Sequence, residues 1–217
     1  MSANTGELKI SSRHLIYFAD PMCSWCWGFS TVIDNILQTF SRTLPVRLVM
    51  GGLRPGISQP MTDDDKARTR HHWEQVEVAS GQSFNFDFFQ RSEFVNNTEP
   101  ACRAVVAARR LDPDKTMSML RALQVAFYRN NCDVTDVKEL ARVAATQGFE
   151  EKSFLAEFED IDTMDDTRAD FWFAQRSGIN SFPTLIAVDN GQYQAVTIGF
   201  SSWDEVEPSL KQWLQTR

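Results

Sequence analysis

Strand signals gather near the two ends of this 217-residue sequence. The runs HLIYFA (14–19) and PVRLVMGG (45–52) are rich in apolar β-formers and predict two buried strands. After a long interval, TLIAV (184–188) and AVTIGF (195–200) flank an Asn-Gly pair at 190–191, which is typical of a hairpin turn. The pattern predicts one α/β sheet built from both ends of the chain.

The long interval between these strands carries helix signals instead. Thr62 precedes three aspartates and can cap a helix that ends at Gly81, and further helical stretches follow it. The first two strands, with the helix between them, form a βαβ unit and should pair in parallel. We therefore expect an α/β domain made of residues 1–61 and 168–217, interrupted by an inserted helical domain at 62–167.

The motif DPMCSWCWGF at 20–29 lies between the first strand and the helix that follows it. Cys23 falls at the start of that helix, where unpaired backbone N–H groups and the helix dipole favour a thiolate. Cys26 lies one turn deeper, within reach of a disulfide bond to Cys23. A C-x-x-C pair near a βαβ unit predicts a redox couple with an attacking and a resolving thiol.

A zinc site and inert buried thiols are the alternatives to a redox couple. A zinc site needs a second Cys/His pair, and His71, His72, Cys102 and Cys132 do not form one at ligand spacing. Adjacent histidines on a helix point to different faces, which favours surface roles for both. Inert buried thiols are a further alternative, but they would not explain the position of the pair. Cys102 and Cys132 are interpreted as isolated thiols, with a second disulfide as the alternative.

Aromatic residues surround the motif. Trp25, Trp27 and Phe29 can form an apolar rim for a peptide or small-molecule substrate, although Trp27 and Phe29 fit a core role equally well. The segment Arg-Pro-Gly at 54–56 follows the second strand, and it either lines a cleft or forms a plain turn.

Charge and hydropathy limit the classes of partner. The formal net charge is −7, which argues against general binding to nucleic acid, because phosphate contacts need clustered cations. No run approaches the roughly 18 apolar residues that a membrane helix needs. The polar N-terminal stretch has no apolar core of a secretory signal, so we expect a cytoplasmic protein.

The order of strand, C-x-x-C, strand, helical insertion, SFPT, hairpin and helix resembles the DsbA family of thioredoxin-fold disulfide oxidoreductases, and within it the cytosolic FrnE-like branch. The resemblance covers most of the chain and rests on DPMCSWCWG, GGLRPG, HHWEQV, NTEPACRAV, AFYRNNCDVTD and SFPTLIAV. It implies that Cys23 is the nucleophile and Cys26 the resolving thiol, with Phe182 and a cis Pro183 facing them. From the residues alone, a trans proline that starts a strand is the expectation.

The sequence also departs from the pattern that this resemblance implies. Ser24 stands where the branch usually has proline, and Asn131-Cys132 where it commonly has glycine-arginine. Thioredoxin places a buried carboxylate six residues before its first cysteine. Here that position is Tyr17, and the nearest acid is Asp20.

The function expected is that of a thiol–disulfide oxidoreductase of the reductase or isomerase type, acting through a mixed disulfide on Cys23. Protein or peptide thiols and disulfides are the expected partners, glutathione is a candidate reductant, and no metal or other cofactor is expected. With no cation between the cysteines, we expect a reduction potential nearer to about −270 mV than to about −120 mV, the values of thioredoxin and DsbA.

Two alternative functions remain open. One is a glutathione-dependent transferase or isomerase of the kappa or 2-hydroxychromene-2-carboxylate isomerase type, whose members typically carry serine at the first cysteine position and lack the second cysteine. The other is a non-catalytic adaptor on the same fold. The sequence does not set the oligomeric state.

Overall fold

Strands from both ends of the chain form one sheet in the computed structural model, which describes residues 13–40 and 43–215. The order is β2-β1-β3-β4, with β1 parallel to β2 and antiparallel to β3, which pairs with β4 as a hairpin. The bounds of these strands are β1 (Arg13–Ala19), β2 (Val46–Met50), β3 (Thr184–Asp189) and β4 (Gln192–Ile198). The predicted parallel pair and the hairpin are both confirmed.

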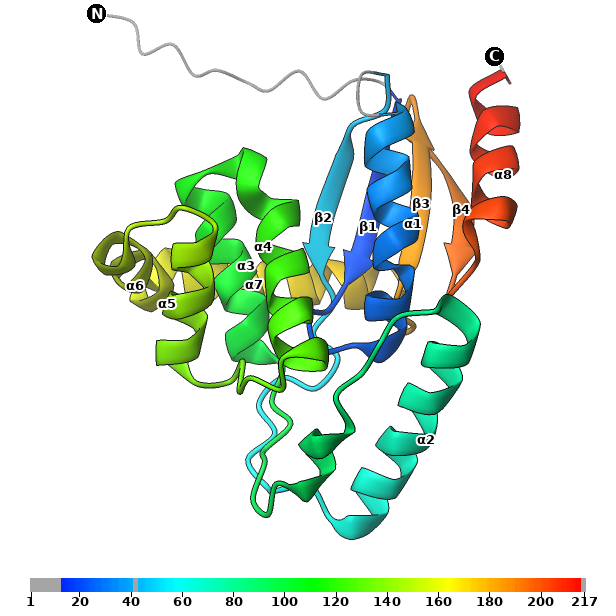
Figure 1. Cartoon of the computed structure of the whole chain (residues 1–217). Coiled ribbons are helices and arrows are strands. Elements are labelled where there is room, and N and C mark those ends of the chain that lie inside the picture. Colours follow the sequence, from blue (N-terminus) through cyan, green and yellow to red (C-terminus); the bar gives the residue numbers. More distant parts are fainter. Residues whose placement is uncertain (1–12, 41–42, 216–217) are drawn as a thin grey trace, which may run out of the picture.

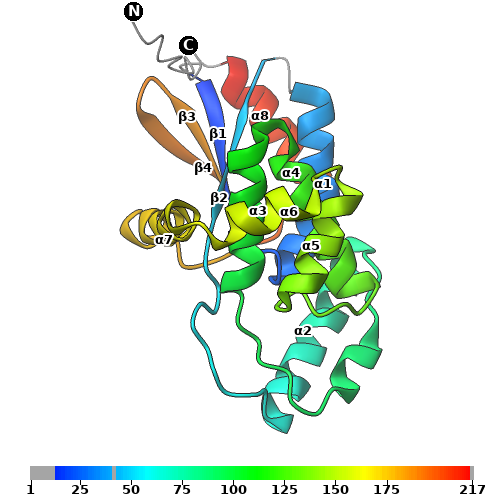
Figure 2. The ribbon, with the colours of Figure 1, turned by 90° about the vertical axis from the view of Figure 1, so that its left-hand side faces the viewer.

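Helices cover both faces of the sheet. Figures 1 and 2 show α1 (Ser24–Phe40) and α8 (Trp203–Gln215) on one face and α7 (Ile161–Arg176) on the other. Because side chains alternate along a strand, Tyr17 of β1 packs towards Phe29 of α1, with ring centroids 5.8 Å apart. Its neighbour Phe18 stacks on Phe173 of α7 from the opposite face, also at 5.8 Å.

The chain between β2 and β3 is helical wherever it has regular structure, as predicted. Its elements are α2 (Asp63–Ser80), the 3-10 turns η1 (Phe86–Gln90) and η2 (Pro113–Lys115), α3 (Glu99–Leu111), α4 (Thr116–Gln124), the π-helical turn η3 (Val125–Arg129), α5 (Val137–Thr146), α6 (Glu151–Glu159) and α7. Thr62 caps α2 and Gly81 ends it in the left-handed conformation, as expected. The domain boundary predicted between 167 and 168 falls inside α7.

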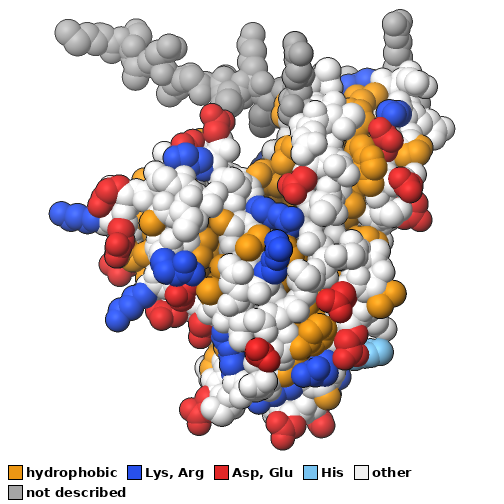
Figure 3. Space-filling model, viewed as in Figure 1, with side chains coloured by type: hydrophobic (Ala, Val, Ile, Leu, Met, Phe, Trp, Pro, Cys, Tyr) orange, Lys and Arg blue, Asp and Glu red, His pale blue; other side chains and the backbone are white. Residues whose placement is uncertain are grey.

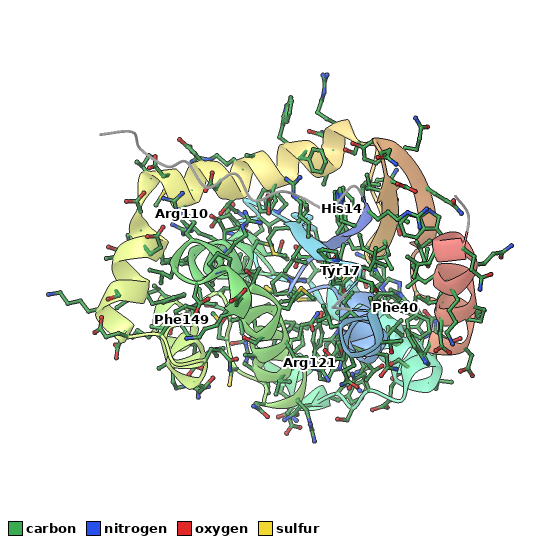
Figure 4. All side chains as sticks on the ribbon, turned by 90° about the horizontal axis from the view of Figure 1, so that it is seen from above. His14, Tyr17, Phe40, Arg110, Arg121 and Phe149 are labelled. Atoms are coloured by element: carbon green, nitrogen blue, oxygen red, sulfur yellow. The ribbon has the colours of Figure 1, made fainter. Side chains whose placement is uncertain are left out.

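Aromatic packing and ion pairs hold the inserted helices together. The Trp73 ring lies 5.2 Å from Tyr128 and 5.0 Å from Phe88, so it joins α2, η1 and η3. Arg110 of α3 pairs with Glu157 of α6 and with Asp166 of α7, the latter at 2.7 Å. Figure 4 shows Arg110 beside α7, on the side of the inserted helices. The insertion is therefore bonded to the helix that covers the sheet.

The described helices include none that is long and apolar enough to cross a bilayer. Figure 3 shows acidic and basic side chains interspersed over the face in view. That face is therefore not a continuous basic surface of the kind that a nucleic-acid backbone binds.

Candidate functional site

Cys23 occupies the junction between β1 and α1 that the sequence predicts. Its carbonyl accepts the first helical hydrogen bond of α1, from the N–H of Trp27 at 3.0 Å, and its own N–H donates to the Asp20 carbonyl at 3.1 Å. Its side chain is only 5% exposed. The Cys23 Sγ lies 3.4 Å from the carbonyl oxygen of Phe182, which brings two segments 159 residues apart into contact.

Cys26 lies one turn further along α1 and is completely buried. Burial, followed by the neighbouring Cys23 thiol, raises the pKa of Cys26 well above its ordinary value. Cys26 therefore stays a thiol at neutral pH. All the cysteines of the described residues are unpaired.

The segment before β3 closes the site from the other side. The Phe182-Pro183 peptide is cis, which agrees with the resemblance and not with the trans isomer expected from the residues alone. The Phe182 ring lies so close to Gly51 that a Cβ on this glycine would come within 2.3 Å of it. A glycine at the end of β2 therefore lets Phe182 pack beside the cysteines.

Asp20 fixes the backbone around the motif, a role that sequence reasoning missed. Its carboxylate is fully buried and accepts the N–H of Met22 and the N–H of Leu53, both at 2.8 Å. The Cys102 Sγ donates to the same carboxylate at 3.3 Å. Desolvation by burial raises the pKa of Asp20, and these backbone hydrogen bonds oppose the shift. The sequence did contain a signal for this role of Asp20, because an acid stands there directly after a buried strand and before a proline.

A cavity of about 270 Å³ opens beside Cys23. Its lining from the α/β part includes Cys23, Trp25, Leu53, Arg54 and Phe182, and its lining from the insertion includes Thr69, His72, Trp73, Phe88, Asn96 and Phe127. Phe127 belongs to the π-helical turn η3, and such turns occur frequently at functional sites. Inserted residues thus form one wall of the cavity that contains Cys23.

The two tryptophans of the motif occupy different environments. Trp25 lines the cavity and packs on Phe200 with ring centroids 5.7 Å apart. Trp27 is only 1% exposed, and its ring stacks on Tyr128 at 5.9 Å. The structure thus places Trp27 in the core, the second of its two expected roles. Trp27 does not line the cavity of Cys23, so its contact with substrate stays a prediction that its burial does not support.

Two buried phenols lie near the cysteines. Tyr17, at the position where thioredoxin has its carboxylate, and Tyr128 both have hydroxyl oxygens with no hydrogen-bond partner among the described residues. Figure 4 shows Tyr17 in the interior of the molecule. Burial is the main cause that raises the pKa of both phenols, and Cys23 and Cys26 add to the shift. Both therefore remain neutral beside the cysteine pair.

The remaining candidate ligands are dispersed. Within the described part of the chain, no three His, Cys, Asp or Glu residues lie together as a metal site would require. His71 Nε2 is 3.0 Å from Gln75 Nε2 on the exposed side of α2, whereas His72 lines the cavity. Cys102 is buried against Asp20, and Cys132 lies 3.4 Å from Arg142 Nη2, so the two occupy different surroundings.

Comparison with known proteins yields a family and related structures. A family model described as thioredoxin matches residues 17–207. The crystal structure of a "putative protein disulfide isomerase" from Nitrosomonas europaea is 34% identical, with a TM-score of 0.89, covering 95% of this chain and 100% of that one. The cytosolic disulfide reductase DsbM from Pseudomonas aeruginosa is 24% identical with a TM-score of 0.78, covering 94% and 100%. A further DsbM structure, at 23% identity, is described with GSH.

Other matches have different described functions. The ClpXP adapter protein SpxH of Halalkalibacterium halodurans is 20% identical over 83% of this chain, which spans 60% of that relative's length. A 2-hydroxychromene-2-carboxylate isomerase is 10% identical with a TM-score of 0.68, covering 93% of this chain and 96% of that one, which is a likeness of fold alone.

Proposed function

Because this chain belongs to the thioredoxin family and has a DsbA-like fold with inserted helices, we propose that it is a cytoplasmic thiol–disulfide oxidoreductase of the reductase or isomerase type. Its working groups are Cys23 as nucleophile and Cys26 as resolving thiol. The FrnE-like branch of the family is the proposed subgroup.

The observation that carries the proposal is the unequal environment of the two thiols. Cys23 lies at the helix start, at the edge of a cavity and 3.4 Å from the Phe182 carbonyl, whereas Cys26 is buried with a raised pKa. A substrate in the cavity meets Cys23 and not Cys26. An attacking thiol that lines a cavity, next to a buried and protonated resolving thiol, is what a two-step exchange needs.

The exchange proceeds through a mixed disulfide. The Cys23 thiolate attacks one sulfur of a substrate disulfide, forming a Cys23–substrate bond and releasing the other sulfur as a thiolate. Cys26 then loses its proton and attacks the Cys23 sulfur, which releases the second substrate thiolate and leaves a Cys23–Cys26 disulfide. The two substrate thiolates take up the two protons that the cysteines gave up, so one disulfide is reduced and one is formed.

Two thiols from a small reductant then reduce the Cys23–Cys26 disulfide and become a disulfide themselves. Glutathione is the proposed reductant, because DsbM has a structure described with GSH. The cysteine pair supplies the redox chemistry, and no other cofactor is needed for it. Trp25, Phe182 and Pro183 are proposed to contact the substrate next to Cys23.

The two alternatives differ from this proposal in testable ways. A glutathione-dependent isomerase would use the thiol of bound glutathione and would not need Cys26. An adaptor would bind its partner equally well with serine at both cysteine positions. The match to SpxH supports the adaptor as the second candidate.

The reduction potential of the Cys23–Cys26 pair tests whether the protein acts as a reductase or as an oxidant. Equilibration with a glutathione redox series, followed by tryptophan fluorescence, should give a value nearer to about −270 mV than to about −120 mV. A value at or above the latter would identify an oxidant instead. The Cys26→Ser variant should accumulate a mixed disulfide with glutathione, detectable by mass spectrometry, and its absence would contradict the assigned roles.

A further inference from the structure

The resolving step needs a negative charge in the buried core. Cys26 is completely buried, and it must lose its proton before its sulfur can attack the Cys23 sulfur. Burial, and after it the Cys23 thiol, raises the pKa of Cys26, although a backbone hydrogen bond from Asp20 opposes the shift. A further hydrogen-bond donor beside the Cys26 sulfur would therefore lower the barrier of this step.

Tyr17 has an unused donor on the same face of α1. The residue is fully buried, and its hydroxyl oxygen has no hydrogen-bond partner among the described residues. Its ring centroid lies 5.8 Å from that of Phe29 of α1. Cys26 stands three residues before Phe29, so the two share one face of the helix, and helical side chains lean towards the preceding turn. Tyr17 thus packs where α1 carries the resolving thiol.

The electrostatics of the phenol agree with this placement. After burial, the Cys26 thiol is the largest cause that raises the pKa of Tyr17, ahead of Cys23. The interaction is reciprocal, because whatever keeps the proton on Tyr17 beside a charged Cys26 also stabilises that charge. A neutral thiol is a weak acceptor, whereas hydrogen bonds to a charged acceptor are roughly twice as strong. The Tyr17 hydroxyl therefore gains a strong partner when Cys26 becomes a thiolate.

Charged groups nearby have other partners. Asp34 of α1 and Arg121 of α4 both interact with Tyr17, but they face each other as an ion pair at 3.7 Å. The Asp20 carboxylate acts on Cys26, but it is an acceptor and cannot donate to a thiolate. These groups leave the Tyr17 hydroxyl available to Cys26.

A second buried phenol is associated with the other cysteine. The hydroxyl oxygen of Tyr128 in η3 also has no hydrogen-bond partner among the described residues. After burial, Cys23 acts more strongly than Cys26 on the pKa of Tyr128, which is the reverse of the order found for Tyr17. The two phenols can therefore be distinguished by experiment.

We propose that the Tyr17 hydroxyl donates a hydrogen bond to the Cys26 sulfur as that thiol loses its proton, and thereby accelerates the resolving step. The inference rests on the proposed function and adds a residue to its second step. In that step the Cys26–Cys23 bond forms and the Cys23–substrate bond breaks. The substrate sulfur leaves with the electron pair of the broken bond and takes up the proton that Cys26 gave up. Tyr17 keeps its own proton throughout.

A disulfide with a coloured thiol separates the two steps. Dithiobis(nitrobenzoate) releases one thionitrobenzoate when Cys23 attacks and a second when Cys26 resolves the mixed disulfide, and stopped-flow absorbance follows both. The partly exposed Cys132 is changed to serine in every protein compared, so that it does not react. In Tyr17→Phe, the first release should change less than about twofold. The second should slow about tenfold or more, the size expected for a hydrogen bond to a charged group.

The pH profile of the second release distinguishes a donor from a packing role. Without the hydroxyl the Cys26 thiolate is less stable, so the profile should move to higher pH by about one pH unit, which is equivalent to tenfold. Because the hydroxyl is unpaired beside the neutral thiol, its removal should leave the melting temperature unchanged or higher. Equal slowing of both releases together with a lower melting temperature would mean lost packing and would overturn the inference.

The other two tyrosines of the chain supply matched variants. Tyr193→Phe removes the same hydroxyl from a residue of β4 that is 69% exposed, and it should change neither release. Tyr128→Phe should slow the second release less than Tyr17→Phe does, and the reverse order would contradict the assignment to Tyr17. A single release from the protein with Tyr17 intact would overturn the proposed function and the inference with it. Two releases that Tyr17→Phe leaves unchanged would overturn the inference alone.

Discussion

Two cavities meet at Phe182, and the larger one is not the one that contains Cys23. The larger, about 630 Å³, lies between α7 and the segment after β2 and is lined by Phe171, Trp172 and Gln175 among others. The smaller, about 270 Å³, contains Cys23. Both share Leu53, Asn180 and Phe182, so the two cavities are neighbours along one surface.

The difference between the two cavities lies in what the backbone supplies to each. The smaller cavity is formed where β1 ends and α1 starts, with inserted helices packed over this junction. The backbone around the Cys23 thiol is therefore held in place by hydrogen bonds. Trp172 in the larger cavity is 60% exposed and no cysteine lines that cavity. The volume of a cavity therefore shows only where a molecule can fit, whereas the helix start and the thiols are the basis for the proposed reaction at the smaller cavity.

The strongest test of this comparison is to remove the proposed nucleophile. Cys23→Ser should lower disulfide reductase activity by about 10³-fold or more, the order expected when a covalent nucleophile is lost. Cys132→Ser, which changes a partly exposed thiol outside both cavities, is the matched control and should keep full activity. Retained activity in Cys23→Ser would move the reaction away from the smaller cavity.

A change at the contact between Gly51 and Phe182, where the two cavities meet, should give the next largest effect. In Gly51→Ala the new Cβ would lie 2.3 Å from the Phe182 ring, so the ring must move from beside Cys23. We expect kcat/KM to fall by about 10- to 100-fold and the free energy of unfolding by about 1–3 kcal/mol. Combining Gly51→Ala with Phe182→Ala should cost less than the sum of the two changes. Strict additivity would show that the contact does not matter.

Alkaline pH should reveal two buried thiols, Cys26 next to Cys23 and Cys102 against Asp20. Cys26 and Cys102 have pKa values raised chiefly by burial, so the unfolded chain loses their protons first. Stability is fully present below about pH 8.5, the ordinary thiol pKa. Above it, each thiol should cost about 1.4 kcal/mol per pH unit until its folded pKa is reached.

Urea unfolding between pH 7 and 10 measures this dependence. Cys102→Ala should be less stable at pH 7, because it leaves a cavity, but its stability should fall less steeply with pH. A slope equal to that of the unmodified protein would contradict the assignment to Cys102.

The smallest effect is expected in the larger cavity. Trp172→Ala should change activity less than twofold and stability within about 0.5 kcal/mol, because the residue is mostly exposed. Trp25→Ala, the same change in the smaller cavity, should reduce activity more. A greater loss from Trp172→Ala with a protein substrate would show that the larger cavity also holds substrate.

Local patterns in the sequence predicted most of the fold. The apolar runs predicted β1 and β2, Asn-Gly predicted the hairpin, and the capping signals at Thr62 and Gly81 predicted α2. The position of Cys23 at a helix start followed from the same kind of signal, because strand ends and helix caps depend on residues a few positions apart. The roles of Cys23 and Cys26 in catalysis stay predictions.

Only the tertiary structure decided which distant residues join the cysteines. Asp20 meets Leu53 and Cys102, and Cys23 meets Phe182, across separations of 33 to 159 residues. It also decided that Trp27 lies in the core whereas Trp25 lines the cavity, although both stand in one motif. Periodicity reports which face of an element is apolar, but packing between elements determines what covers that face. The cavity beside Cys23 exists for that reason only in the folded chain.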